Sequence, residues 1–188
     1  AQTTADGVVV LLHDADLRRV ASGRQRLRDI DYDQLANIDI GSWFAPEFSS
    51  ERIPTLQEAI DLARGRIKLN IELKYTWEDP ALAEKVGSLI RRSQFTSECV
   101  VSSLNFSVLT EIERDFPELT TGFIVLQAIG DLSRMKVDFL SISAARATPR
   151  LVRAVHRHGR EVHVWTVNDP GNTLSMIEMG VDNIITDE

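Results

Sequence analysis

The chain has 188 residues, 43% of them hydrophobic and 26% charged, with a formal net charge of −7 at pH 7. These values are typical of a globular protein with one substantial core, either a domain or most of a larger barrel. The negative charge argues against a nucleic-acid-binding protein, which needs a basic face, but leaves a small anionic substrate possible. The one cysteine, Cys99, excludes a disulfide within the chain and is interpreted as a buried structural thiol. No apolar stretch reaches the roughly 20 residues that span a bilayer.

The first predicted element is a β-hairpin. Asp6-Gly7 is a turn signal, and the apolar run 8–12 is predicted to be the returning strand, which ends at His13-Asp14. His13 is a candidate general acid or base, because imidazole titrates near neutral pH. A His-Asp pair at the end of a strand is more often a turn or a cap, so this pattern alone does not decide the role.

The segment 14–54 interrupts the regular pattern. It is charged, and its one helical candidate lies around residues 32–37. A loop of this length inside a compact domain is usually functional or ordered by its own contacts. We interpret it as an insertion between elements of the main fold.

From residue 55 onward, helices and strands alternate. Six strands alternating with helices predict a parallel sheet with helical crossovers, in a doubly wound sheet or a (β/α)₈ barrel. The sequence has no Gly-x-Gly-x-x-Gly motif after a strand, so the nucleotide-binding form of the doubly wound sheet has no support. No obvious linker divides the chain, which is interpreted as one domain. Helices are predicted at 55–65, 79–95, 105–116, 127–135, 148–159 and 169–180, and strands at 67–74, 99–104, 120–126, 137–143, 161–167 and 181–187.

Four residues are predicted to mark helix ends. Thr55 and Asp79 are the expected N-caps, and Asp79 is followed by a proline that suits the first turn. Gly159 and Gly180 are expected to close their helices, because glycine readily adopts the left-handed conformation there.

The strand "LNIELK" has one polar face. Side chains alternate along a strand, so Asn70, Glu72 and Lys74 point to the same side. One interpretation is a structural ion pair at the edge of a sheet. The other is a site for a phosphate ester, in which the carboxylate holds a hard divalent cation and the lysine neutralises phosphoryl oxygens.

The remaining candidates are weaker. His156 and His158 are two residues apart on a helix, so they do not share a face and are interpreted as solvated. His163 shares a strand face with Trp165, and packing is favoured for it over a pocket-lining role. Trp165 lies near the end of its strand and is either a core residue or the wall of a substrate pocket.

Several motifs together resemble one family. "DGVVVLLHDADLRR", "IPTLQEAIDLA", "LNIELK", "VVSSLNFSVLTEIERDFPEL", "VHVWTVND" and "GVDNIITD" are similar, in this order, to the glycerophosphodiester phosphodiesterases, over nearly the whole chain. The resemblance implies a (β/α)₈ barrel. It also implies hydrolysis of glycerophosphodiesters to glycerol 3-phosphate and an alcohol, with Ca²⁺ or Mg²⁺ and two histidines as acid and base.

The resemblance also assigns roles to single residues. His13 matches the second catalytic histidine, and Glu72 matches a metal-binding glutamate. Lys74 matches the lysine near the phosphate, and Trp165 matches the aromatic residue on the glycerol side of the pocket. The segment 14–54 matches the small subdomain inserted in these proteins.

The chain departs from the family at its start. The strands that carry His-Arg-Gly and Glu-x-Asp in the family are not in the sequence, so about six of eight barrel strands are expected in one partial domain over residues 1–188. A protein that lacked those strands is expected to be inactive and poorly stable. Two alternatives stay open, a non-catalytic barrel with a binding or regulatory role and a lysophospholipase D-type phosphodiesterase. The compartment is also open: cytoplasmic, or extracytoplasmic with attachment to a membrane region outside this chain.

Overall fold

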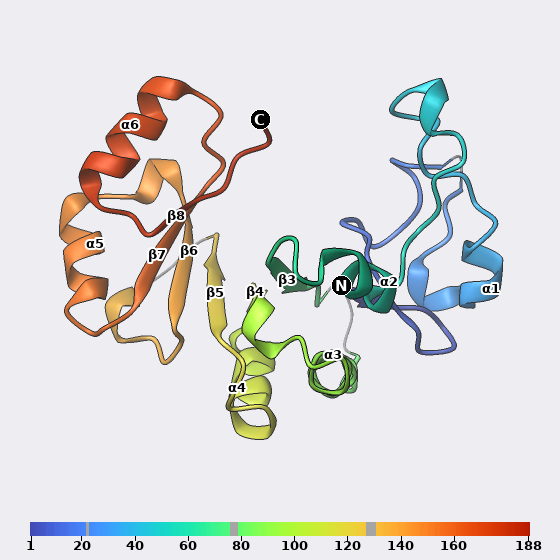
Figure 1. The fold of residues 1–188 in the computed structure, drawn as a ribbon, viewed down its shortest axis with the longest axis horizontal. Helices are drawn as coiled ribbons and strands as arrows, with labels where there is room; N and C mark the ends of the chain where they lie inside the picture. The colour runs from blue at the N-terminus through green and yellow to red at the C-terminus, as the bar shows by residue number, and fades with distance from the viewer. Residues whose placement is uncertain (22, 76–78, 127–130) are drawn as a thin grey trace. The chain divides into compact units, whose positions relative to one another are not determined.

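The computed structural model of the chain describes residues 1–21, 23–75, 79–126 and 131–188 and forms two compact units, Ala1–Cys99 and Val100–Glu188 (Figure 1). The single domain expected over the whole chain stays a prediction. Among the described residues, no helix combines the length and the hydrophobicity needed to cross a bilayer. The elements are β1 (Gln2–Thr3), β2 (Val9–Val10), α1 (Tyr32–Leu35), α2 (Leu56–Ala63), β3 (Leu69–Leu73), α3 (Leu82–Arg92), β4 (Cys99–Ser103), α4 (Phe106–Asp115), β5 (Thr121–Val125), β6 (Phe139–Ser143), α5 (Pro149–His156), β7 (Glu161–Trp165), α6 (Pro170–Met179) and β8 (Asn183–Ile184).

The first unit begins with the predicted hairpin. β1 and β2 are antiparallel, with Gln2 opposite Val10 and Thr3 opposite Val9. Gly7 has φ of 83°, which only glycine adopts without strain, and its N–H donates to the Thr4 carbonyl at 3.0 Å. The pairing with β1 ends at Val10, so the backbone of residues 11–14 needs other hydrogen-bond partners.

The segment after β2 has a small core of its own. Its four-residue helix α1 is shorter than the helix expected at 32–37, and most of the segment is irregular. An antiparallel bridge joins Asp16 and Arg26. Apolar side chains from the segment pack with those of the hairpin, so the segment is held by burial rather than by regular hydrogen bonding. These side chains are Val10, Leu12, Leu17, Val20, Leu27, Ile30, Leu35 and Ile53.

The two predicted N-caps concern helices α2 and α3 of the first unit. Thr55 caps α2 as predicted, because its hydroxyl accepts from Glu58 N–H at 3.1 Å while the Glu58 carboxylate accepts from Thr55 N–H at 2.7 Å. The prediction for α3 is wrong. That helix begins at Leu82 with Ala81 as its N-cap, because Asp79 accepts hydrogen bonds from Ala81 N–H and from the buried Thr3 hydroxyl instead.

The second unit contains a parallel sheet in the order β4-β5-β6-β7-β8. Figure 1 shows α5 and α6 along one face of this sheet. Gly180 closes α6 at φ 81°, as predicted, and Gly159 has φ 68° three residues beyond the end of α5. Of the helix expected at 127–135, residues 127–130 lie outside the described residues, and the rest holds only a short 3₁₀ turn at Leu132–Arg134. The core under α5 and α6 includes Leu140, Ile142, Val152, Val155, Val162, Val164 and Met176.

The opposite face of this sheet carries glycine, aromatic and polar residues. Gly122 lies beside Phe139, and a Cβ at Gly122 would fall 2.0 Å from the Phe139 ring. His163, only 5% exposed, stacks on that ring with centroids 4.0 Å apart, which supports packing as its role. Trp165 follows two residues later and therefore shares this face, as predicted.

Two aspartates repeat one arrangement at the start of strands. Asp138, before β6, accepts from Thr121 N–H at 2.7 Å while its own N–H donates to the Thr121 carbonyl at 2.9 Å. Asp182, before β8, makes the same pair of bonds with Val162, at 2.7 and 2.9 Å. Each carboxylate therefore ties the entry of its own strand to the neighbouring strand.

Candidate active site

Strand β3 and the residue that follows it place Glu72 and Lys74 on one polar face. Ile71 and Leu73 are buried at 4% and 1% exposure, whereas Asn70 is exposed, as the alternating pattern predicts. Lys74 Nζ lies 2.9 Å from Glu72 Oε2, and both side chains are partly buried. The two residues thus form the ion pair that one interpretation expected.

A pocket in the first unit brings this ion pair together with His13. Its volume is about 330 Å³, which is at the lower end of the size of small-molecule sites. Apolar walls come from the returning hairpin arm, from α2 and from β3, and the charged groups come from β3. The lining residues are Ala1, Leu11, Leu12, His13, Leu56, Ala59, Leu69, Asn70, Ile71, Glu72 and Lys74.

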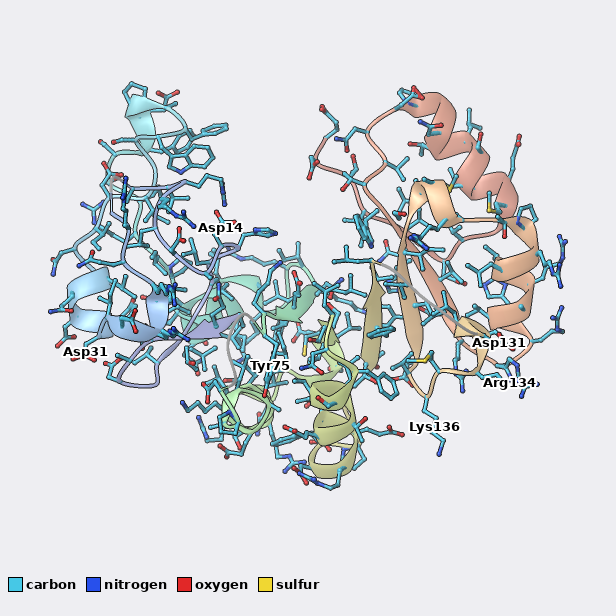
Figure 2. All side chains as sticks on the ribbon, turned by 180° about the vertical axis from the view of Figure 1, so that it is seen from behind. Asp14, Asp31, Tyr75, Asp131, Arg134 and Lys136 are labelled. Carbon is cyan, nitrogen blue, oxygen red and sulfur yellow. The ribbon has the colours of Figure 1, made fainter. Side chains whose placement is uncertain are left out.

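The ring of His13 is oriented by its neighbour. Nδ1 lies 2.8 Å from Asp14 Oδ1, and Arg19 Nε donates to Asp14 Oδ2 at 2.6 Å. The hydrogen bond from His13, followed by that from Arg19, lowers the pKa of Asp14 below its usual value. An ionised Asp14 holds the proton on Nδ1, which leaves Nε2 for proton transfer. Asp14 lies on the irregular segment after β2 (Figure 2).

The backbone around His13 is held by a residue that the sequence did not indicate. Gln2 is 1% exposed, and its Nε2 donates to the carbonyls of Leu12 and Asp14, each at 2.8 Å. Leu11 N–H donates to the Pro54 carbonyl at 2.9 Å, and this bond ties the same arm to the start of α2. A glutamine in a short strand carries no local signal for such contacts, because they depend on the path of the chain after the hairpin.

An aromatic cluster continues outward from Asp14 and Arg19. The Arg19 guanidinium lies 5.1 Å from the centroid of the Trp43 ring, a cation–π contact. Trp43 meets Phe44 edge-on with centroids 5.9 Å apart, and Phe44 lies 5.6 Å from Phe48. The three rings are 50%, 71% and 40% exposed, so the segment 14–54 presents an aromatic surface linked to His13 through Arg19 and Asp14.

Trp165 belongs to the second unit. It ends β7 on the face away from α5 and α6, and its Nε1 is buried without a hydrogen-bond partner among the described residues. Nδ1 of His163 is likewise buried without a hydrogen-bond partner among the described residues, although Nε2 of the same ring lies 3.1 Å from Glu161 Oε2. A buried indole N–H without a partner is a group that a polar ligand atom can satisfy. The structure thus brings His13, Glu72 and Lys74 together in one unit, and Trp165 stands in the other.

The described residues do not by themselves make a site for the predicted cation. Ca²⁺ and Mg²⁺ need about six or more oxygen ligands. Glu72 is one carboxylate, already paired with Lys74, and the described part of the chain contains no group of three His, Cys, Asp or Glu side chains that could hold a metal. Waters and substrate oxygens can complete the coordination of such a cation, so Glu72 could supply one ligand, beside charge neutralisation by Lys74 and proton transfer by His13.

Comparison with solved structures identifies the class of fold. A glycerophosphodiester phosphodiesterase from Agrobacterium tumefaciens superposes with a TM-score of 0.85 at 24% identity, over 99% of this chain and 80% of that one. The fold is the (β/α)₈ barrel of this type, and the described residues supply six strands of it. Both the predicted barrel and its partial extent are confirmed.

The family follows from the sequence itself. A model of the glycerophosphoryl diester phosphodiesterase family matches residues 1–188, and the chain belongs to this family. A glycerophosphodiester phosphodiesterase of Caldanaerobacter subterraneus is 29% identical over 197 residues, which cover 100% of this chain and 79% of the relative. A phosphodiesterase from Oleispira antarctica, solved with the product sn-glycerol-3-phosphate, has a TM-score of 0.84 at 26% identity and covers 99% of this chain and 78% of that one.

Proposed function

We propose that the protein hydrolyses glycerophosphodiesters to glycerol 3-phosphate and an alcohol. The observation that carries the proposal is the meeting of His13, Glu72 and Lys74 in one pocket of a chain that belongs to this family. The pocket combines a cation for a phosphodiester oxygen with an imidazole for proton transfer. The Oleispira relative, which binds sn-glycerol-3-phosphate, supports the same class of product.

The residues of the pocket have separable tasks in this proposal. Lys74 binds a phosphoryl oxygen and offsets negative charge as the P–O bond to the alcohol breaks. His13 transfers a proton through Nε2, while Asp14 holds the ring in place through Nδ1. Overall, one water is consumed: its hydroxyl group ends on phosphorus and its other proton ends on the released alcohol.

Dependence on Ca²⁺ or Mg²⁺ is part of the proposal, with Glu72 as one ligand. The cation would neutralise phosphoryl charge, as such ions do in phosphoryl-transfer sites. Activity is expected to disappear with a chelator and to return with added Ca²⁺ or Mg²⁺. Glu72→Gln is expected to raise the metal concentration needed for half-maximal activity. Full activity of the wild type in excess chelator would refute the metal dependence but not the proposed hydrolysis.

The decisive assay is the release of glycerol 3-phosphate from glycerophosphocholine and glycerophosphoethanolamine by the complete protein. His13→Ala is expected to lower kcat by about 10²–10⁴, because proton transfer is lost. His158→Ala is the matched control, since that histidine is exposed on the second unit and does not line the pocket. A folded wild type without turnover on any glycerophosphodiester would instead favour a non-catalytic binding or regulatory barrel.

A lysophospholipid is the second candidate substrate. The exposed rings of Trp43, Phe44 and Phe48 favour it, because they offer apolar surface for an acyl chain and connect to His13 through Arg19 and Asp14. Lysophosphatidylcholine is therefore assayed beside glycerophosphocholine with wild type and Trp43→Ala. A loss in Trp43→Ala confined to the lysophospholipid would support this second activity, and equal effects on both substrates would refute it.

A further inference from the structure

The side chain of Gln2 bridges the two peptide groups on either side of His13. Its amide nitrogen donates to the carbonyl of the preceding residue, Leu12, and to that of the following residue, Asp14, both at 2.8 Å. Gln2 is 1% exposed, so water has almost no access to compete for these bonds. Each bond is therefore expensive to leave unmade.

The chemistry of the contact fixes the orientation of the amide. A carboxamide has two N–H donors on nitrogen and an oxygen that only accepts. Both partners here are carbonyl oxygens, so only the nitrogen can face them. The two donors of one group are thus directed at the backbone that flanks one histidine.

The hairpin explains why a side chain is needed at this place. The ladder between β1 and β2 consists of the pairs Gln2–Val10 and Thr3–Val9, and it stops before His13. Beyond it, Leu11 is tied to Pro54 through its N–H. The Gln2 amide therefore attaches the part of this arm that reaches the pocket, residues 12–14, to β1.

We propose that Gln2 is a positioning residue for His13. It fixes the backbone from which the imidazole projects, while Asp14 fixes the rotation of the ring, and together they hold the imidazole in place at the pocket that His13 lines. The catalytic part of this inference rests on the proposed proton transfer by His13. Because a displacement of about 1 Å can cost about 100-fold in rate, a loosened backbone should lower kcat while leaving KM little changed.

The test compares two substitutions on the same strand of the complete protein. Gln2→Met keeps length and volume but removes both donors. Thr3→Val is the matched control: it removes one buried hydrogen bond, to Asp79, without touching the backbone of His13. We expect Gln2→Met to lower kcat about 10- to 100-fold with KM within about threefold, and Thr3→Val to change kcat by less than about threefold.

A second measurement does not depend on activity. Backbone ¹⁵N order parameters of His13 and Asp14 are expected to fall from about 0.85 toward 0.6 in Gln2→Met and to stay unchanged in Thr3→Val. If Gln2→Met does not fold, Gln2→Asn replaces it, because its shorter amide cannot reach both carbonyls.

The two readouts separate the possible failures. Unchanged order at His13, or a loss of kcat equal to that of Thr3→Val, would overturn the role of Gln2. A wild type without turnover, combined with lost order at His13 in the variant, would overturn the proposed function and support the positioning of this backbone.

Discussion

Replacement of Gly122 by alanine tests how closely the sheet of the second unit is packed on the face opposite α5 and α6. Gly122 lies beside Phe139 in the register of β5 and β6. An added Cβ would fall 2.0 Å from two atoms of the Phe139 ring and 2.4 Å from a third. The ring is 1% exposed and stacked on His163, so it has little room to move away.

The expected cost follows from two opposing effects. Overpacking of a filled core costs about 1–3 kcal/mol. Alanine recovers about 0.5–1 kcal/mol relative to glycine, because the unfolded chain loses flexibility. The difference is at most about 2.5 kcal/mol, and because the approach of 2.0 Å is so close, the free energy of unfolding should fall by about 1–2 kcal/mol and the Tm of a chain of this size by about 2–8 °C.

Thermal and urea unfolding of four proteins measure this effect: wild type, Gly122→Ala, Phe139→Leu and the double variant. The smaller leucine makes room for the new methyl group, so the double variant should be no less stable than Phe139→Leu alone. The corresponding coupling free energy is about 1–2 kcal/mol, within the range for residues in contact. An unchanged Tm for Gly122→Ala, or strict additivity in the cycle, would show that the ring does not occupy this space.

Two further predictions concern titrating groups in the first unit. Burial raises the pKa of Cys99 to about 11, so only about a thousandth of the thiol is ionised at pH 8. A thiol reagent should therefore label Cys99 slowly in the folded protein and rapidly after unfolding. Fast labelling of the native protein would contradict this prediction. Hydrogen bonds from the Ser42 hydroxyl and from the N–H groups of Ser42 and Gly41 lower the pKa of Asp39 from 3.8 to about 2. Its contribution to loop order is thus fully present above pH 3.8 and lost as the pH falls to about 2. An NMR titration of this carboxyl checks the prediction, and a midpoint near 4 would refute it.

The alternation of strands and helices could be predicted because its signals are local. The period-2 pattern of "LNIELK" places Glu72 and Lys74 on one face, and Thr55 with Glu58 marks the start of α2. The Asp6-Gly7 turn likewise placed His13 at the end of a returning arm. These features depend on neighbours within a few residues, so a single sequence contains them.

The contacts that shape the site could not be predicted in the same way. Gln2 binds the carbonyls of Leu12 and Asp14, and Arg19 binds the Asp14 carboxylate, all on irregular chain where no period relates sequence separation to distance. Asp79 was expected to cap α3, but the buried hydroxyl of Thr3, distant in sequence, binds it. The cap was therefore decided by tertiary contacts, which override local preference.

The paired bonds of Asp138 and Asp182 have a consequence for how the parallel sheet assembles. Parallel strands have no tight turn between them, so the connections leave their register free to slip. If β6 or β8 were displaced by two residues, its side chains would still face the correct sides. The aspartate, however, would lose its donor, and the N–H of Thr121 or Val162 in the neighbouring strand would lose its acceptor. A misregistered sheet would therefore be penalised at the entry of two of its strands, even where the apolar pattern alone would tolerate it.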